Sequence, residues 1–162
     1  MQNLKILNTR DVKHILEKLE AQFDYVVSRE ELEYIFLMNK DNRIYLLSKD
    51  VGQIDLDLLR IDAMGVYFGE LYNESIRLSI EGAQIIAQSA TKGIVHIARE
   101  EMLSWIKGSD IPYEENPGNS FIIVAYHNPI TQKDDILGCG KWKDGRIMNY
   151  VSKSRKLVVV NE

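Results

Sequence analysis

The chain has 162 residues, of which 45% are hydrophobic and 27% are charged, and its formal net charge is −4. A chain of this size can bury the core of one domain or of two small ones. It has no apolar run of membrane-spanning length and no basic-then-apolar N-terminal signal, and its single cysteine cannot form an internal disulfide. We therefore expect a cytoplasmic globular protein rather than a membrane protein or a disulfide scaffold.

The first predicted element is an amphipathic helix over residues 9–23, with Thr9 as the expected N-cap. Its apolar side chains recur at helical spacing, at Val12, Ile15, Leu16, Leu19 and Phe23. Two apolar runs follow, residues 34–38 and 44–47, with four turn-forming residues between them. This pattern predicts a β-hairpin.

A further strand is expected over residues 63–71, and a short extended segment over residues 76–78. Gly65 and Gly69 lie within the longer strand, where a glycine indicates a bulge or the close approach of another backbone. We expect the seam between two halves of the chain near residues 72–79.

Beyond the seam the sequence predicts two short helices separated by a strand. Ser79 is expected to cap a helix over residues 80–88, and residues 94–98 read as an apolar strand. A second helix is expected over residues 99–107, ended by Gly108 in the usual glycine position after the last turn.

From residue 120 onward the sequence predicts strands alone, over residues 121–126, 136–140, 147–151 and 157–160. Several of these runs are apolar on both faces. Strands that are covered on both sides suit a small closed barrel with helices packed outside.

The tail of the chain is basic, although the chain as a whole is acidic. After Gly140 only Asp144 and Glu162 oppose six basic residues, which are Lys141, Lys143, Arg146, Lys153, Arg155 and Lys156. The tail therefore carries a net charge of +4, and the rest of the chain carries a net charge of −8. A concentrated basic surface on an acidic body favours the docking of a polyanion, although such runs are often only solvated surface.

The sequence contains no convincing catalytic or metal-binding set. His14, His96 and His127 have no ligand partner at metal-binding spacing, and His96 reads as a core or edge histidine. Cys139 lies in the glycine-flanked run 137–140, where a small side chain suits packing better than nucleophilic chemistry. We therefore predict no enzymatic activity, no cofactor and no metal.

Aromatic residues are interleaved with the basic ones, at Trp105, Tyr113, Tyr126, Trp142 and Tyr150. An exposed ring beside a lysine or arginine can stack an unpaired base, but burial is the commoner state of aromatic residues. Trp142 is the best candidate for exposure. If it faces inward instead, strand alternation directs both Lys141 and Lys143 outward.

Four segments of the second half resemble, in combination, the PUA domain, the RNA-binding module named for pseudouridine synthase and archaeosine transglycosylase. They are Ile94–Ile97, Glu100–Ile111, Asp135–Lys141 and Lys156–Val160. In the first half, residues 41–48, 67–70 and 77–79 resemble the pre-PUA domain of ribosome-assembly factors and archaeosine transglycosylases. The chain departs from the family pattern at Pro117–Gly118, which follows an acidic insertion.

The resemblance implies an α+β fold with an N-terminal mixed α/β pre-PUA domain over residues 1–75. A C-terminal PUA β-barrel with flanking helices would follow over residues 76–162. The resemblance also implies RNA contact at the turn after the second helix and along the closing strand. Together with the other cations that the charge pattern singles out, the expected RNA-binding residues are Lys92, Lys107, Gly108, Ser109, Asp110, Lys141, Lys143, Arg146, Lys153, Arg155 and Lys156.

We therefore expect a cytoplasmic protein that docks structured RNA, either tRNA or rRNA. It would be an accessory factor in RNA modification, such as archaeosine formation in tRNA, or in ribosome biogenesis. Its acidic first half would meet a protein partner, an RNA-modifying enzyme or a pre-ribosome component, with no membrane involved. The alternatives are a protein–protein adaptor that does not contact RNA and, less expected, a small enzyme that uses Cys139.

Overall fold

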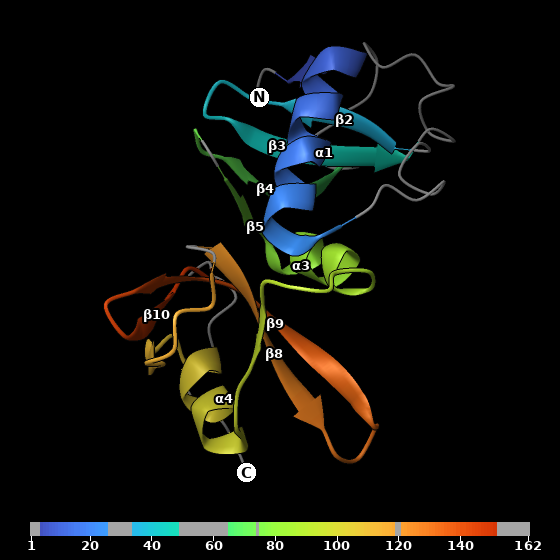
Figure 1. The fold of residues 1–162 in the computed structure, drawn as a ribbon. Coiled ribbons are helices and arrows are strands. Elements are labelled where there is room, and N and C mark those ends of the chain that lie inside the picture. The colour runs from blue at the N-terminus through green and yellow to red at the C-terminus, as the bar shows by residue number, and fades with distance from the viewer. Residues whose placement is uncertain (1–3, 26–33, 49–64, 74, 119–120, 152–162) are drawn as a thin grey trace.

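The computed structural model describes residues 4–25, 34–48, 65–73, 75–118 and 121–151. These residues form two five-stranded sheets with helices packed against them, an α+β fold as predicted (Figure 1). None of the helices in these ranges is long and apolar enough to cross a lipid bilayer.

The first sheet is antiparallel throughout and has the strand order β1-β2-β3-β4-β5. Its strands are β1 (Lys5–Ile6), β2 (Tyr34–Met38), β3 (Arg43–Ser48), β4 (Val66–Leu71) and β5 (Ile76–Leu78). The predicted hairpin is confirmed as β2 and β3, with Asn42 in the left-handed region at the turn (φ 62°). The two-residue strand β1 was not predicted, because so short a strand leaves no periodic pattern in the sequence.

Helix α1 (Thr9–Phe23) covers one face of the first sheet (Figure 1). Its N-cap is Asn8, not the predicted Thr9, because the Asn8 side chain accepts a hydrogen bond from the Asp11 N–H at 2.9 Å. Ile15, Leu19 and Phe23 are buried beneath the helix, as their spacing predicted.

The second sheet has the strand order β6-β8-β9-β10-β7, in which only β6 and β8 run parallel. Its strands are β6 (Ile94–His96), β7 (Ile111–Pro112), β8 (Phe121–Asn128), β9 (Lys133–Lys143) and β10 (Arg146–Asn149). The sheet is curled like a half-barrel. The predicted closing strand at residues 157–160 lies outside the described residues, so the closure of the barrel stays a prediction.

Strand β9 is longer than the predicted run of residues 136–140. The extra residues at its start, Lys133 to Asp135, are exposed and polar, because the β8–β9 hairpin extends beyond the core (Figure 1). A solvated strand has no apolar alternation, so the sequence gives no signal for it.

The other two helices are α3 (Ile80–Ala87) and α4 (Arg99–Ile106), close to the predicted bounds. Ser79 caps α3 as expected, because its Oγ accepts a hydrogen bond from the Gly82 N–H at 2.9 Å. Gly108 follows α4 with φ 106°, the left-handed conformation expected of a glycine after a helix.

The two sheets share one hydrophobic core. Ile44, Phe68 and Ile76 of the first sheet belong to the same buried cluster as Phe121 and Ile123 of β8. The alternate residues of β8, Ile122 and Val124 among them, enter a second cluster beneath α4. Strand β8 is therefore covered on both faces, which explains its continuous apolar run.

Helix α3 lies between the two sheets, at the seam (Figure 1). Glycines permit this close packing, since a Cβ on Gly82 would lie 2.1 Å from the Phe68 carbonyl oxygen. As predicted, Gly69 marks a register shift between β3 and β4 and a close approach of another backbone. A Cβ added at this glycine would lie 2.5 Å from the Arg77 carbonyl oxygen. The domain boundary between residues 75 and 76 stays a prediction, and β5 pairs with the first sheet.

Candidate nucleic-acid interface

The β9–β10 hairpin places three of the predicted cations on one face. Arg146 is the cross-strand partner of Lys143, and Met148 is the partner of Lys141. Directly paired residues share a face of a sheet, and alternate residues of a strand point the same way. Lys141, Lys143, Arg146 and Met148 therefore form one surface, which we call the hairpin face.

Trp142 lies on the opposite side of this hairpin. It is half-buried against the second core, and its Nε1 donates a hydrogen bond to the Tyr113 carbonyl oxygen at 2.7 Å. Trp142, the best candidate for exposure, therefore faces inward, because the indole has both a packing site and an acceptor there. The alternative holds: the inward tryptophan directs Lys141 and Lys143 toward the other face. Trp105 is only 1% exposed and is not available for base stacking.

The hairpin face is not neutralised by any carboxylate among the described residues. The ion pairs within those ranges join Arg77 to Glu70, and Asp134 to His96 and His127. In the same ranges, no acidic oxygen lies within 4.0 Å of Lys141, Lys143 or Arg146. Their charge is therefore available to an external polyanion.

The turn after α4 is attached to the end of β10. The Gly108 N–H donates to the Trp105 carbonyl at 2.9 Å, and Asp110 Oδ1 accepts from the Asn149 N–H at 2.7 Å. The Asn149 side chain donates to the carbonyl oxygens of Trp105 (2.8 Å) and Ser109 (3.3 Å). The predicted Gly108, Ser109 and Asp110 thus form a turn that is held to the sheet. Lys107, at the end of α4, is exposed beside them.

The turn and the hairpin cations lie at opposite ends of β10. Arg146 begins this strand and Asn149 ends it, so at the strand rise the two ends are about 10 Å apart. Lys153, Arg155 and Lys156 lie outside the described residues. Val151, the last described residue, donates its N–H to Asn149 Oδ1 at 2.9 Å, close to the turn.

Lys92 is not brought to this surface in the same way. It precedes β6, at the opposite edge of the second sheet from β7, with β8 and β9 between β6 and β10. Its backbone N–H donates to the Phe23 carbonyl in α1 at 3.4 Å.

A chain of aromatic and cationic side chains leads from the hairpin face to the seam. Lys141 Nζ lies 5.7 Å from the centre of the Phe121 ring, and that ring is 5.9 Å from Tyr150 and 5.2 Å from Tyr72. The Arg77 guanidinium lies 5.6 Å from the centre of the Tyr150 ring. Sequence reasoning missed Arg77, Phe121 and Tyr72 because three separate segments meet only in the folded chain.

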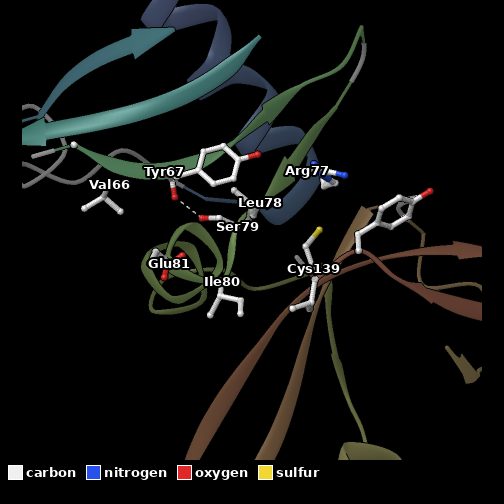
Figure 2. A pocket seen from close by; sticks show the side chains of 11 residues that line it. Val66, Tyr67, Arg77, Leu78, Ser79, Ile80, Glu81 and Cys139 are labelled. Carbon is white, nitrogen blue, oxygen red and sulfur yellow. Dashed lines mark hydrogen bonds between the residues drawn. The ribbon is translucent and has the colours of Figure 1, made fainter. Parts of the chain in front are cut away.

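A pocket of about 470 Å³ opens at the seam beside Arg77 (Figure 2). Tyr67, Arg77 and Ser79 line it from the first sheet and the turn into α3, and Cys139 and Tyr150 line it from the second half. We call it the seam pocket. The guanidinium of Arg77 is held by Glu70 Oε2 at 2.9 Å.

Cys139 lies at the wall of the seam pocket with its sulfur directed toward the first sheet (Figure 2). Burial raises the pKa of its thiol to about 12. A nucleophilic cysteine needs a lowered pKa, so this environment opposes thiolate formation.

A second group of polar residues joins β6, β8 and β9 away from the seam. His96 Nε2 lies 2.8 Å from Asp134 Oδ2, and His127 Nδ1 lies 2.9 Å from Asp134 Oδ1. Hydrogen bonds from His96, and secondly from His127, lower the pKa of Asp134. His96 is exposed on an edge strand, and the described part of the chain contains no group of three side chains suited to hold a metal ion.

Comparisons with known proteins agree with this architecture. Residues 92–157 match the family described as the methyltransferase RsmF PUA domain. Ribosomal RNA small subunit methyltransferase F of Aeromonas hydrophila is 26% identical over 147 residues, which cover 91% of this chain and 28% of the relative. The protein of the same name from Photobacterium profundum is 24% identical over 144 residues, which cover 89% of this chain and 28% of the relative. The chain thus spans about a quarter of the length of these relatives.

A solved structure shows the same fold. The crystal structure of a PUA domain from Aeropyrum pernix K1, in a tartrate complex, aligns with a TM-score of 0.50 at 12% sequence identity. The alignment covers 87% of this chain and 72% of that one.

The curled second sheet, its flanking helices and the matched segment have the architecture of a PUA domain. Residues 92–157 of this chain are related to the PUA domain of RsmF, and the chain has the fold of a PUA-domain protein. The resemblance seen in the sequence is confirmed, as is the predicted α+β fold.

Proposed function

We propose that this protein binds structured RNA through the hairpin face and the Gly108 turn. One observation carries the proposal. A PUA sheet presents Lys141, Lys143 and Arg146 on one face, and no carboxylate of the described residues neutralises them. Phosphate contacts of this kind supply much of the affinity of a protein for nucleic acid.

Ribosomal RNA is the preferred RNA in this proposal. The curated relatives carry names that refer to methylation of small-subunit ribosomal RNA. The finer role we propose is that of an accessory factor which holds an rRNA helix for modification or during ribosome assembly.

Recognition would depend on shape and phosphate contacts more than on base reading. An A-form helix hides its major-groove edges, and the indoles of Trp105 and Trp142 are turned toward the core. Three phosphate contacts, one for each hairpin cation, would give a slope of log K against log salt of about −2 to −3.

We further propose that the protein acts without catalysis of its own and that an RNA-modifying enzyme or a pre-ribosome component is its partner. The buried thiol of Cys139, with its raised pKa, supports this proposal. The acidic first half of the chain is the surface we assign to that partner.

The test compares two triple variants that lose equal charge. Lys141→Gln/Lys143→Gln/Arg146→Gln removes the hairpin cations. Arg10→Gln/Lys13→Gln/Lys40→Gln removes two lysines and one arginine that are exposed on the first half. With a helical fragment of small-subunit rRNA, the first variant should weaken binding at least tenfold and flatten the salt dependence, and the second should change little. Equal effects would overturn the assignment of the surface, and no binding by the wild-type protein would overturn the function.

A further inference from the structure

We infer that the seam pocket binds a single unstacked nucleobase of the RNA that lies on the hairpin face. This inference rests on the proposed function and goes beyond it, because it assigns a specific ligand to a cavity formed between the two halves of the chain.

The size and position of the pocket suit a nucleobase with part of its ribose. Its volume of about 470 Å³ lies within the usual range of small-ligand pockets. Its walls come from β4, β5, the start of α3 and β9 (Figure 2). A pocket built on such packed elements is largely formed before a ligand arrives.

The lining offers planar groups for stacking. Tyr67 and Tyr150 both line the pocket, together with Arg77. The Arg77 guanidinium is already held in place by Glu70 and lies over the Tyr150 ring. Aromatic rings and guanidinium planes are the groups on which proteins stack unpaired bases.

The charged residues of the pocket lining are one cation, Arg77, and one anion, Glu81, and the rest of the wall is uncharged. Cys139 is a buried thiol, and Leu78, Ile80 and Val151 add apolar surface. Burial raises the pKa of Cys139 to about 12, so the thiol carries no charge at neutral pH. An apolar wall beside aromatic rings favours the face of a base over a phosphate group.

A chain of ring contacts links the pocket to the proposed phosphate surface. Tyr150 lines the pocket and contacts Phe121, and Phe121 lies beneath the ammonium group of Lys141 on the hairpin face. A strand whose phosphates contact Lys141 therefore has its neighbouring nucleotide near Tyr150.

The pocket also explains the glycine in the run 137–140. Gly138 has φ 118° in a register shift between β8 and β9, and a Cβ there would lie 2.8 Å from Val151 and 3.4 Å from Ile80. The absence of a side chain at Gly138 leaves room for these two side chains of the pocket wall, and the bulge redirects the strand at Cys139.

The experiment uses a short RNA duplex with one bulged 2-aminopurine nucleotide, and the same duplex without the bulge. The wild-type protein should bind the bulged duplex roughly 5- to 150-fold more tightly, the range expected for stacking one base. Stacking in the pocket should also quench the fluorescence of the 2-aminopurine.

Two variants and their matched controls locate the effect. Ile80→Trp fills the pocket without removing a polar group, whereas Gln84→Trp adds the same ring to an exposed site on α3. Tyr150→Ala removes a stacking surface, whereas Tyr126→Ala removes a half-buried tyrosine that does not line the pocket. Each pocket variant should abolish the preference for the bulge and the quenching, and each control should retain both. Circular dichroism and thermal melting establish that the variants are folded.

The outcomes separate this inference from the proposed function. If the wild-type protein binds both duplexes equally and the hairpin-face triple variant binds both more weakly, the assignment of a nucleobase site is wrong. The assignment of the RNA-binding surface then stands. Retained preference in folded Ile80→Trp and Tyr150→Ala proteins would also overturn the site. If the wild-type protein binds neither duplex nor the rRNA fragment, both conclusions fail.

Discussion

Asn149 donates its backbone N–H to the Asp110 carboxylate at 2.7 Å, which joins the end of β10 to the turn after α4. The Asn149 side chain adds a hydrogen bond to the Trp105 carbonyl at 2.8 Å. One residue thus connects two segments that sequence reasoning assigned to RNA binding on separate grounds.

Asn149→Ala should destabilise the protein by about 1–3 kcal/mol, because the Trp105 and Ser109 carbonyls lose their shared donor. Urea denaturation measures the loss. Asn73→Ala, at an exposed position, is the control and should change the free energy of unfolding by less than about 0.5 kcal/mol. Equal stability of the two variants would show that the turn is not held by Asn149.

Gly138→Ala should be more destabilising than Gly145→Ala. Both glycines have positive φ, 118° and 80°, so both alanines incur backbone strain of about 1–2 kcal/mol. Only the Gly138 Cβ meets a neighbour, Val151 at 2.8 Å, whereas nothing lies within 4 Å of the Gly145 Cβ. Thermal unfolding of the two variants gives the difference, and the reverse order would contradict the packing around the bulge.

Cys139 should resist alkylation in the folded protein. Burial shields its sulfur and raises the pKa of its thiol to about 12, so little thiolate exists at pH 8. The reaction with iodoacetamide, followed by mass spectrometry, should be slow in buffer and fast in urea. Cys139→Ala should keep its RNA affinity. Rapid labelling of the native protein would instead favour the alternative of a small enzyme that uses this cysteine.

Asp134 should make stability depend on pH in the acid range. Its folded-state pKa is lowered, first by the hydrogen bond with His96 and then by that with His127. Its contribution is therefore present above the ordinary carboxyl pKa near 3.8 and is lost as pH falls through the lower folded-state value. Because the side chain is exposed, we expect only a few tenths of a kcal/mol.

Denaturation in urea from pH 6 down to pH 3 tests this dependence. The wild-type protein should be more stable than Asp134→Asn at pH 6, and the gap should narrow toward pH 3. Asp41→Asn, which removes the same charge at an exposed turn in the first half, is the control for the change in net charge. A difference in the free energy of unfolding that widens as the pH falls would contradict the predicted contribution of Asp134.

Local patterns predicted most of the elements. The spacing of Ile15, Leu19 and Phe23 predicted α1, and the apolar run at Phe121 predicted a strand that is covered on both faces. The glycine at position 69 predicted a bulge that the register confirms. These features depend on neighbours in the sequence, which is why periodicity and residue type reveal them.

The sequence pattern predicted less of the site than of the fold. Lys141, Lys143 and Arg146 were predicted from charge alone, and their common face follows from strand pairing that no single strand shows. Arg77 and Tyr150 meet across the seam from segments 73 residues apart, so no local pattern links them. The sequence left the orientation of Trp142 open, because its acceptor, the Tyr113 carbonyl, belongs to a distant loop.

Mapping backbone amide shifts by NMR, while a helical fragment of small-subunit rRNA is titrated in, tests the central claim most directly. We predict that the largest shifts fall on Lys141, Lys143 and Arg146 of the β9–β10 hairpin and on Gly108 and Ser109 of the adjoining turn. Shifts confined to α1 and the first sheet, with the hairpin unchanged, would contradict the claim that this face of the PUA sheet binds RNA.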